Sequence, residues 1–260
     1  MFNKQVCFYM RISVFKRMKA VVKMIVEHTV GNEKYDKFVI ITSPRTGSNL
    51  LVSLLSSNRY IHAEGELFNH IQEESCSEIW QRTFSKHLPW IKAVGFKIFY
   101  DHPLASEDKS VWDMIRRDRS IKIIHLVREN MLRSQLSLQI AYKTNIWGLT
   151  PTMKDTPLQR RRIEINNHNF VTKLREIDSH KKSIRETFEG HPFFELSYEE
   201  LISNTHVKMN RIFNFLEAPR NKVKTNLRKQ NSESLKDLII NYKEFRQHIE
   251  QTEFASMLND

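Results

Sequence analysis

The chain has 260 residues with 7 proline and 6 glycine residues, a length that suits one well-cored domain and a composition that leaves no flexible linker to divide it. Its 41 basic and 30 acidic residues give a formal net charge of +11, which would attract a polyanionic donor or an acidic acceptor. The two distant cysteines, Cys7 and Cys76, exclude a disulfide framework and a cysteine metal site. We therefore expect a cytoplasmic protein.

Residues 1–34 form a basic N-terminal extension, and residues 35–260 a single α/β domain. In the extension, apolar residues at helical spacing alternate with lysines and arginines: Val14, Met18, Val21, Val22 and Ile25. Such a basic amphipathic helix could contact a membrane surface weakly or, as the sequence favours, dock on its own domain. No apolar run reaches the roughly 18 residues of a spanning helix, so we expect neither a signal peptide nor an anchor.

Residues 38–55 predict a strand, a turn of small residues and a helix. The apolar run 38–41 is typical of a parallel strand that is covered on both faces. Ser43 and Pro44 end the strand, and Gly47 permits a close approach of the backbone. Leucines then recur at helical spacing: Leu50, Leu51, Leu54 and Leu55. The helix is therefore expected to begin near residues 46–48.

The turn of this unit predicts an anion site. The first amide N–H groups of a helix lack intrahelical partners, and together with the helix dipole they favour a phosphate or a sulfate. Arg45 adds a permanent positive charge. A Walker A loop would need an earlier glycine and a lysine, and the turn has neither. An NTPase loop is thus a poor match, and a turn without a ligand remains the simplest alternative.

This turn resembles the 5'-phosphosulfate loop of sulfotransferases, which use 3'-phosphoadenylyl sulfate (PAPS) as the sulfuryl donor. The resemblance implies that Arg45, Thr46, Gly47, Ser48 and Asn49 bind the donor, with Arg45 also acting in catalysis. It implies no metal.

Residues 63–69, Ala-Glu-Gly-Glu-Leu-Phe-Asn, resemble the Gly-Glu-x-Phe-Asn stretch of bacterial carbohydrate sulfotransferases of the nodulation-factor, lipopolysaccharide and trehalose types. This resemblance implies a carbohydrate, glycolipid or other small-molecule hydroxyl as the acceptor. It makes Glu66 the catalytic base, which a nearby Arg45 would keep ionised while burial raised its pKa. Glu66 could instead only complement a helix dipole. The rival bases are Glu64, His62, His70 and His102.

Residues 121–142 resemble the 3'-phosphate site of the same family. The apolar run 121–127 leads to Arg128, which would lie at the carboxyl end of a strand, where open α/β sheets bind ligands. The resemblance implies that Arg128 and Ser137 bind the 3'-phosphate. Many members place the serine eight positions after the arginine, where this chain has Leu136, so Ser134 remains an alternative to Ser137. Without the resemblance, the simplest interpretation is that Arg128 forms a surface ion pair with Glu129 or Glu199.

Four later segments extend the resemblance to about residue 258. Residues 196–202 and 212–216 resemble the Tyr-Glu-x-Leu and Phe-Leu block, and residues 229–231 with 240–242 resemble the closing segment. The matches occur in the expected order, which is more specific than each motif alone.

The expected fold is α/β: a P-loop-like three-layer arrangement with a central parallel sheet and helices on both faces. Strands are predicted near residues 38–42, 94–100, 121–127 and 193–197, with helical patterns in the intervals. We expect the acceptor pocket to be built from loops such as 80–90 and 143–156.

Basic runs at residues 160–162 and 181–182 raise the alternative of nucleic-acid binding. Apolar residues at spacings of three, four and seven argue instead for one helix with these charges on its solvated face: Ile163, Phe170, Leu174, Ile177, Ile184 and Phe188. We therefore expect no nucleic-acid partner. The main alternative function is a nucleotide-dependent phosphotransferase, in which Asp101 would hold magnesium after its strand.

Overall fold

The computed structural model describes residues 26, 29–71, 74–104, 106–148, 152–153, 156–227 and 230–259. The expected helix in residues 1–34 lies almost wholly outside these residues, as do Cys7 and Lys229. In the described part no helix is long and apolar enough to cross a membrane.

Five parallel strands form one sheet in the order β2-β3-β1-β4-β5. Their bounds are β1 Asp36–Thr42, β2 Ile61–Glu64, β3 Ala93–Phe99, β4 Lys122–Val127 and β5 Phe193–Ser197. Four of them agree with the predicted strands to within two residues. Strand β2 was missed and lies in an interval expected to be helical. It is a four-residue edge strand with two polar side chains, His62 and Glu64, and is too short to show a periodic pattern.

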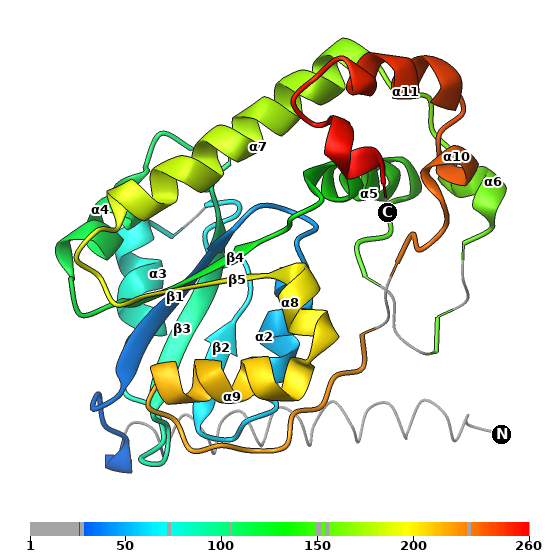
Figure 1. Cartoon of the computed structure of the whole chain (residues 1–260). Helices are drawn as coiled ribbons and strands as arrows, with labels where there is room; N and C mark the ends of the chain where they lie inside the picture. The colour runs from blue at the N-terminus through cyan, green and yellow to red at the C-terminus, as the bar shows by residue number, and fades with distance from the viewer. Residues whose placement is uncertain are drawn as a thin grey trace, which may run out of the picture.

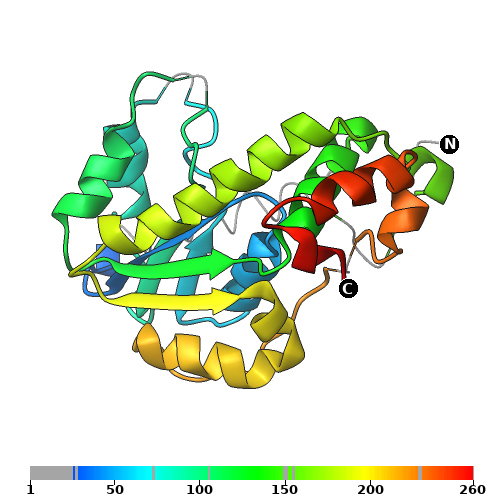
Figure 2. The ribbon, with the colours of Figure 1, turned by 45° about the horizontal axis from the view of Figure 1, so that its top comes forward.

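Helices cover both faces of this sheet, as predicted (Figures 1 and 2). One face packs against α2, α8 and α9, and the other against α3, α4 and the end of α7. The bounds are α2 Ser48–Ser56, α3 Cys76–Thr83, α4 Ser110–Arg117, α7 Asn167–Thr187, α8 Tyr198–Ser203 and α9 Thr205–Phe215. Residues 38–41 are fully buried, because helices cover their strand on both faces. Such a strand carries a continuous apolar run.

A third apolar cluster joins the remaining helices beyond the carboxyl ends of the strands (Figure 1). These are α5 Met131–Thr144, α6 Leu158–Arg161, α10 Leu235–Leu238, α11 Tyr242–Glu250 and the 3₁₀ helix η1 Ala255–Leu258. They pack against the first half of α7. This cluster fixes α5 and the C-terminal segment over the edge of the sheet where parallel α/β folds place ligands.

The prediction of one helix from residue 163 was partly wrong. Ile163 lies before α7 and pairs as an isolated bridge with Ile239. Arg161 does not lie on a solvated face: its guanidinium pairs with Glu233 at 2.5 Å, and its side chain is 16% exposed. Lys182 is exposed, as expected, and pairs with Asp178 on the same helix. Helical spacing alone could not show that residues 162–166 are not helical and that α6 packs on α10.

Candidate active site

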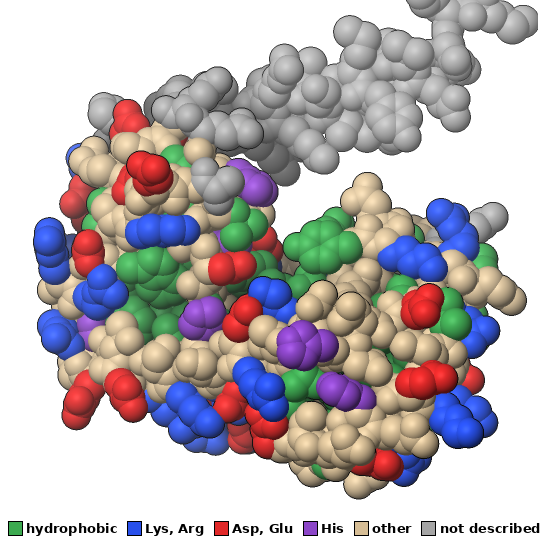
Figure 3. All heavy atoms as spheres, turned by 90° about the horizontal axis from the view of Figure 1, so that it is seen from above, with side chains coloured by type: hydrophobic (Ala, Val, Ile, Leu, Met, Phe, Trp, Pro, Cys, Tyr) green, Lys and Arg blue, Asp and Glu red, His purple; other side chains and the backbone are tan. Residues whose placement is uncertain are grey.

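A cavity of about 740 Å³ opens at the carboxyl ends of β1, β3 and β4. We call it the central cavity. It lies between the loop at the start of α2, the loops that follow β2 and β3, and the segment after α5, and Figure 3 shows the hollow from above. The residues that line it include these candidates from the sequence: Arg45, Gly47, Ser48, Asn49, Glu66 and Arg128. None of the residues of the predicted acceptor loop 80–90 lines this cavity, whereas Trp147 and Gly148 from the other predicted loop do.

The turn before α2 presents an uncapped helix N-terminus to this cavity. Gly47 is the N-cap residue, with φ +82°, and α2 has neither a side-chain cap nor an acidic residue in its first turn. A Cβ at Gly47 would lie 2.4 Å from the Tyr198 ring, so only glycine fits between the two. The free N–H groups of the first turn therefore remain available for an anion.

Arg45 is the second residue of this turn with a left-handed backbone conformation. Its φ is +63°, a conformation that non-glycine residues rarely adopt outside special sites. The guanidinium donates to Ser137 Oγ at 3.0 Å, to the Trp147 carbonyl at 2.6 Å and to Gln230 Oε1. All three partners are neutral, and among the described residues Arg45 contacts no carboxylate. Burial, and then the charge of Arg128, lower the pKa of Arg45.

Arg128 lies at the end of β4, as predicted, and stacks over the Tyr198 ring at 4.6 Å. It donates to the Arg45 carbonyl at 3.1 Å, and its Nε is buried without a hydrogen-bond partner in the described structure. The ion pair considered from the sequence is a long one, from this same Nε to Glu199 Oε1 at 3.6 Å. Arg128 is also among the residues that line the cavity.

The two candidate serines on α5, Ser134 and Ser137, have different surroundings. Ser137 lines the cavity and accepts from Arg45 and from Asn231 Nδ2, the latter at 3.1 Å. Ser134 is buried, and its hydroxyl donates to the carbonyl of Met131 within the helix. Thr46 also turns away from the cavity: its hydroxyl contacts Thr42 and the carbonyl of Ser43 inside the loop. Any contact of Thr46 with a ligand would therefore involve its backbone.

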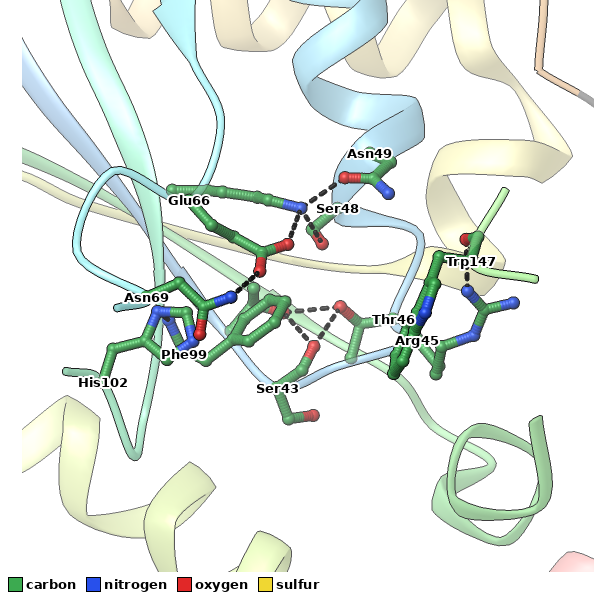
Figure 4. Close-up of polar contacts among 12 residues, drawn as sticks. Ser43, Arg45, Thr46, Ser48, Asn49, Glu66, Asn69, Phe99, His102 and Trp147 are labelled. Carbon is green, nitrogen blue, oxygen red and sulfur yellow. Dashed lines mark hydrogen bonds and ion pairs between the residues drawn. The ribbon is translucent and has the colours of Figure 1, made fainter. Parts of the chain in front are cut away.

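Glu66 lies across the cavity from Arg45, with Asn69 and His102 near it (Figure 4). The cation at this carboxylate is Lys97, not Arg45 as the sequence suggested: Lys97 Nζ lies 2.8 Å from Glu66 Oε1. Asn69 Nδ2 donates to the other oxygen at 3.3 Å. Among the rival bases, His62 and Glu64 pair with each other at 2.8 Å and do not line the cavity.

Lys97 is the functional candidate that the sequence reading missed. Its side chain is only 2% exposed, and the ammonium also donates to Asn49 Oδ1 and lies 3.5 Å from Ser48 Oγ. It thereby joins Glu66 to the first turn of α2. Burial lowers the pKa of Lys97, and Glu66 partly opposes that shift. A lone lysine inside the apolar strand Ala-Val-Gly-Phe-Lys-Ile-Phe was the available signal, since buried lysines need partners.

Two histidines remain at the wall near Glu66. His70 is exposed and lines the cavity, and His102 is buried beside Phe99. The backbone N–H of Phe99 points at His102 Nδ1 from 3.4 Å, and burial lowers the pKa of this imidazole. His102 is therefore held neutral at pH 7. In the described residues no group of three or more His, Cys, Asp and Glu side chains is placed to hold a metal ion.

The cavity thus brings an uncapped helix N-terminus and a carboxylate together at the edge of a parallel α/β sheet. The profile of the sulfotransferase domain matches residues 35–257, so the chain belongs to the sulfotransferase family. This confirms the resemblance found in the sequence.

Two curated relatives are similar over most of their length. Nodulation protein H of Rhizobium tropici is 25% identical over 228 residues, 82% of this chain and 89% of that protein. Nodulation protein H of Rhizobium meliloti (strain 1021) is 24% identical over 233 residues, 84% of this chain and 93% of that protein. The crystal structure of a sulfotransferase from Alicyclobacillus acidocaldarius shares the fold, with a TM-score of 0.51 and 13% identity over 85% of this chain and 93% of that one.

Proposed function

We propose that this sulfotransferase transfers a sulfuryl group from PAPS to a hydroxyl of a carbohydrate or glycolipid, with Glu66 as the general base. The observation that carries the proposal is the division of one cavity into two chemically different halves. The cationic half consists of the first turn of α2, Arg45, Arg128 and Ser137. The acidic half consists of Glu66, Asn69, His70, Asp101 and His102, and Lys97 joins the two.

The cationic half fits a donor with two separate phosphate groups. Arg45 and the free N–H groups of residues 47–49 would hold the 5' end. Arg128 and Ser137 would hold the 3'-phosphate, and the position of both at the cavity, with Arg128 bonded to the Arg45 carbonyl, supports this assignment. Because Arg45 has only neutral partners, a bound phosphate would also relieve its repulsion with Arg128.

When bound, the donor supplies a sulfuryl group joined to its 5'-phosphate by a bridging oxygen. Glu66 takes the proton from the acceptor hydroxyl as the acceptor oxygen bonds to sulfur and the bond from sulfur to the bridging oxygen breaks. Lys97 and the first turn of α2 stabilise the negative charge that passes to the 5'-phosphate. The contact of Lys97 with both Glu66 and Asn49 supports a role at the point where the two substrates meet.

Calorimetric titration with 3',5'-adenosine diphosphate, beside ATP with magnesium, tests the donor site. The full chain should bind the 3',5'-diphosphate and respond little to ATP. Arg128→Ala should weaken binding about 10- to 150-fold, the loss of one charged hydrogen bond. Arg59→Ala is the matched control, because Arg59 is exposed, stacks on Tyr60 and does not line the cavity. A preference for ATP with magnesium would contradict the proposal and favour phosphoryl transfer.

A further inference from the structure

Residues 230–233, which we call the strap, contact the cationic half of the cavity. Gln230 lines the cavity and accepts from the Arg45 guanidinium, and Asn231 Nδ2 donates to Ser137 Oγ at 3.1 Å. Asn231 has φ +50°, a left-handed conformation that asparagine tolerates better than most residues. Two consecutive amide side chains of the strap thus hold two of the groups that are assigned to the donor phosphates.

The strap belongs to no helix or strand, so its position depends on side-chain contacts. Arg161 of α6 makes a forked contact with it: Nη1 and Nη2 donate to the two carboxylate oxygens of Glu233 at 2.7 and 2.5 Å. These hydrogen bonds lower the pKa of Glu233. Arg133 of α5 donates to the Glu233 carbonyl at 2.7 Å. A forked pair between two partly buried side chains fixes orientation as well as distance.

Arg161 is itself held by the helices beyond the sheet. Its Nε donates to the Thr156 carbonyl at 2.9 Å, and α6 packs against α10 (Figure 1). Directly after α6, the Ile163 N–H donates to the Leu238 carbonyl at 2.9 Å, and the Ile240 N–H donates to the Ile163 carbonyl at 2.8 Å. Arg161 does not line the cavity, so any effect on the donor would pass through the strap.

We propose that Arg161 is a positioning residue of the donor site, which acts through Glu233 to hold the strap against Arg45 and Ser137. Without this ion pair, the two amide side chains of the strap would have to be ordered when the donor binds, and that cost would weaken binding. The inference rests on the proposed function and adds a residue that acts from outside the cavity. It also gives a role to one member of the basic run 160–162, which the sequence analysis assigned to a solvated surface.

The test is calorimetric titration of 3',5'-adenosine diphosphate into the full chain and its variants. Arg161→Ala and Glu233→Ala should each weaken binding about tenfold, because each releases the strap. The sign of the second effect is decisive. Glu233→Ala removes a negative charge and frees a nearby guanidinium, so charge alone predicts tighter binding of an anionic nucleotide. Unchanged or tighter binding by Glu233→Ala would overturn the proposal.

The double variant Arg161→Ala with Glu233→Ala keeps the net charge of the wild type. It should bind the nucleotide about as weakly as either single variant, because the second substitution removes a contact that is already lost. Losses that add up in the double variant would overturn the pairing of the two residues.

Two matched controls isolate the strap. Arg160→Ala removes an exposed charge from the same basic run. Arg175→Ala breaks another forked pair, with Glu253 at 2.8 and 3.1 Å, and neither of these two residues lines the cavity. Both variants should bind the nucleotide as the wild type does. A loss in either control as large as that in Arg161→Ala would overturn the proposal.

Urea unfolding without nucleotide separates positioning from stability. A merely structural role would lower the stability of Arg161→Ala and leave the nucleotide affinity of the folded protein unchanged, an outcome that would overturn the proposal. Arg161→Lys keeps the charge but not the fork, so its affinity should lie between those of the wild type and Arg161→Ala, and it serves as the test if the alanine variant does not fold. A wild type that does not bind the nucleotide would overturn the proposed function itself. Equal binding by the wild type and Arg161→Ala would overturn only the positioning role.

Discussion

The cationic and acidic halves of the central cavity are built in different ways. The cationic half rests on backbone geometry: an uncapped helix N-terminus and two left-handed residues, Arg45 and Gly47. Arg45 is held by neutral groups, and Arg128 by the Arg45 carbonyl and a long ion pair with Glu199. The acidic half is made of side chains on the loops after β2 and β3. A net charge of +11 is thus no guide to the local charge of a binding site.

The difference suggests how each half recognises its ligand. Fixed backbone donors with charged arginines favour anionic groups at set positions, which suits a donor common to a whole class of enzymes. Loop side chains can change without disturbing the sheet, which suits an acceptor that differs between relatives. Lys97 contacts Glu66 in the acidic half and Asn49 in the cationic half. Substitutions at Lys97 therefore test how far the two halves act separately.

The largest effect is expected from Glu66→Gln. The amide keeps the shape of the side chain but cannot take a proton, so turnover should fall by about two to four orders of magnitude. Affinity for 3',5'-adenosine diphosphate should stay near normal, because Glu66 lies in the acidic half. Glu64→Gln is the matched control: this carboxylate pairs with His62 away from the cavity. Turnover that is equal in Glu66→Gln and Glu64→Gln would remove Glu66 from catalysis.

Lys97→Met should lower turnover by about 10²- to 10³-fold, because it removes a buried positive charge at the reacting groups. It also leaves Glu66 without its cation, so the variant should lose stability. The double variant Lys97→Met with Glu66→Gln should regain part of that stability but be less active than Glu66→Gln alone, because the positive charge at the leaving phosphate is still lost.

Lys122→Met is the control for Lys97. This lysine is also largely buried, with Asp36 and Glu217 as partners, but at the opposite end of the sheet. It should lose stability and keep the turnover number of the folded protein. If Lys97→Met behaved in the same way, Lys97 would have only a structural role.

Gly47→Ala should act on the cationic half alone. A methyl group there would force an unfavourable φ and meet the Tyr198 ring, so unfolding free energy should fall by about 1–3 kcal/mol and nucleotide affinity should fall with it. Gly65→Ala is the matched control in the acidic half, because a Cβ there meets nothing within 4 Å. Urea unfolding and calorimetry measure both effects. Normal nucleotide binding by Gly47→Ala would contradict the proposed role of the turn.

The smallest effect is expected from mild acid. Burial lowers the pKa of His102 and His125 in the folded chain. Below the ordinary histidine pKa of about 6.5 the unfolded chain therefore binds protons that the folded chain does not, and stability falls as the pH falls. At pH 5.5 each histidine contributes a loss of at most about 1.4 kcal/mol.

Urea unfolding at pH 7.5, 6.5 and 5.5 measures this loss. His102→Gln should make the dependence shallower, since it removes one of the two groups. Carboxylates whose pKa is held low in the folded chain, such as Asp108 at about 2, lose their contribution only at lower pH and do not interfere. Stability that rose between pH 7.5 and 5.5 would contradict the burial of these histidines.

Local patterns predicted the parts of the molecule that depend on neighbours in sequence. The strand, turn and helix at residues 36–56 follow from an apolar run, from small turn residues and from leucines at helical spacing. The position of Arg128 followed from its place at the end of an apolar strand. The edge strand β2 and the irregular segment at 162–166 were missed, because pairing partners distant in sequence define them.

The sequence by itself determined the α/β class, the strand, turn and helix at residues 36–56 and the order of the motifs, because backbone propensity and apolar periodicity are local properties. Only the tertiary structure decided which charges meet. It paired Glu66 with Lys97, turned Ser137 toward Arg45 and Ser134 into its own helix, and set Trp147 at the cavity. These contacts join residues up to about a hundred positions apart through the order of strands and the packing of α5, and no local pattern encodes that geometry.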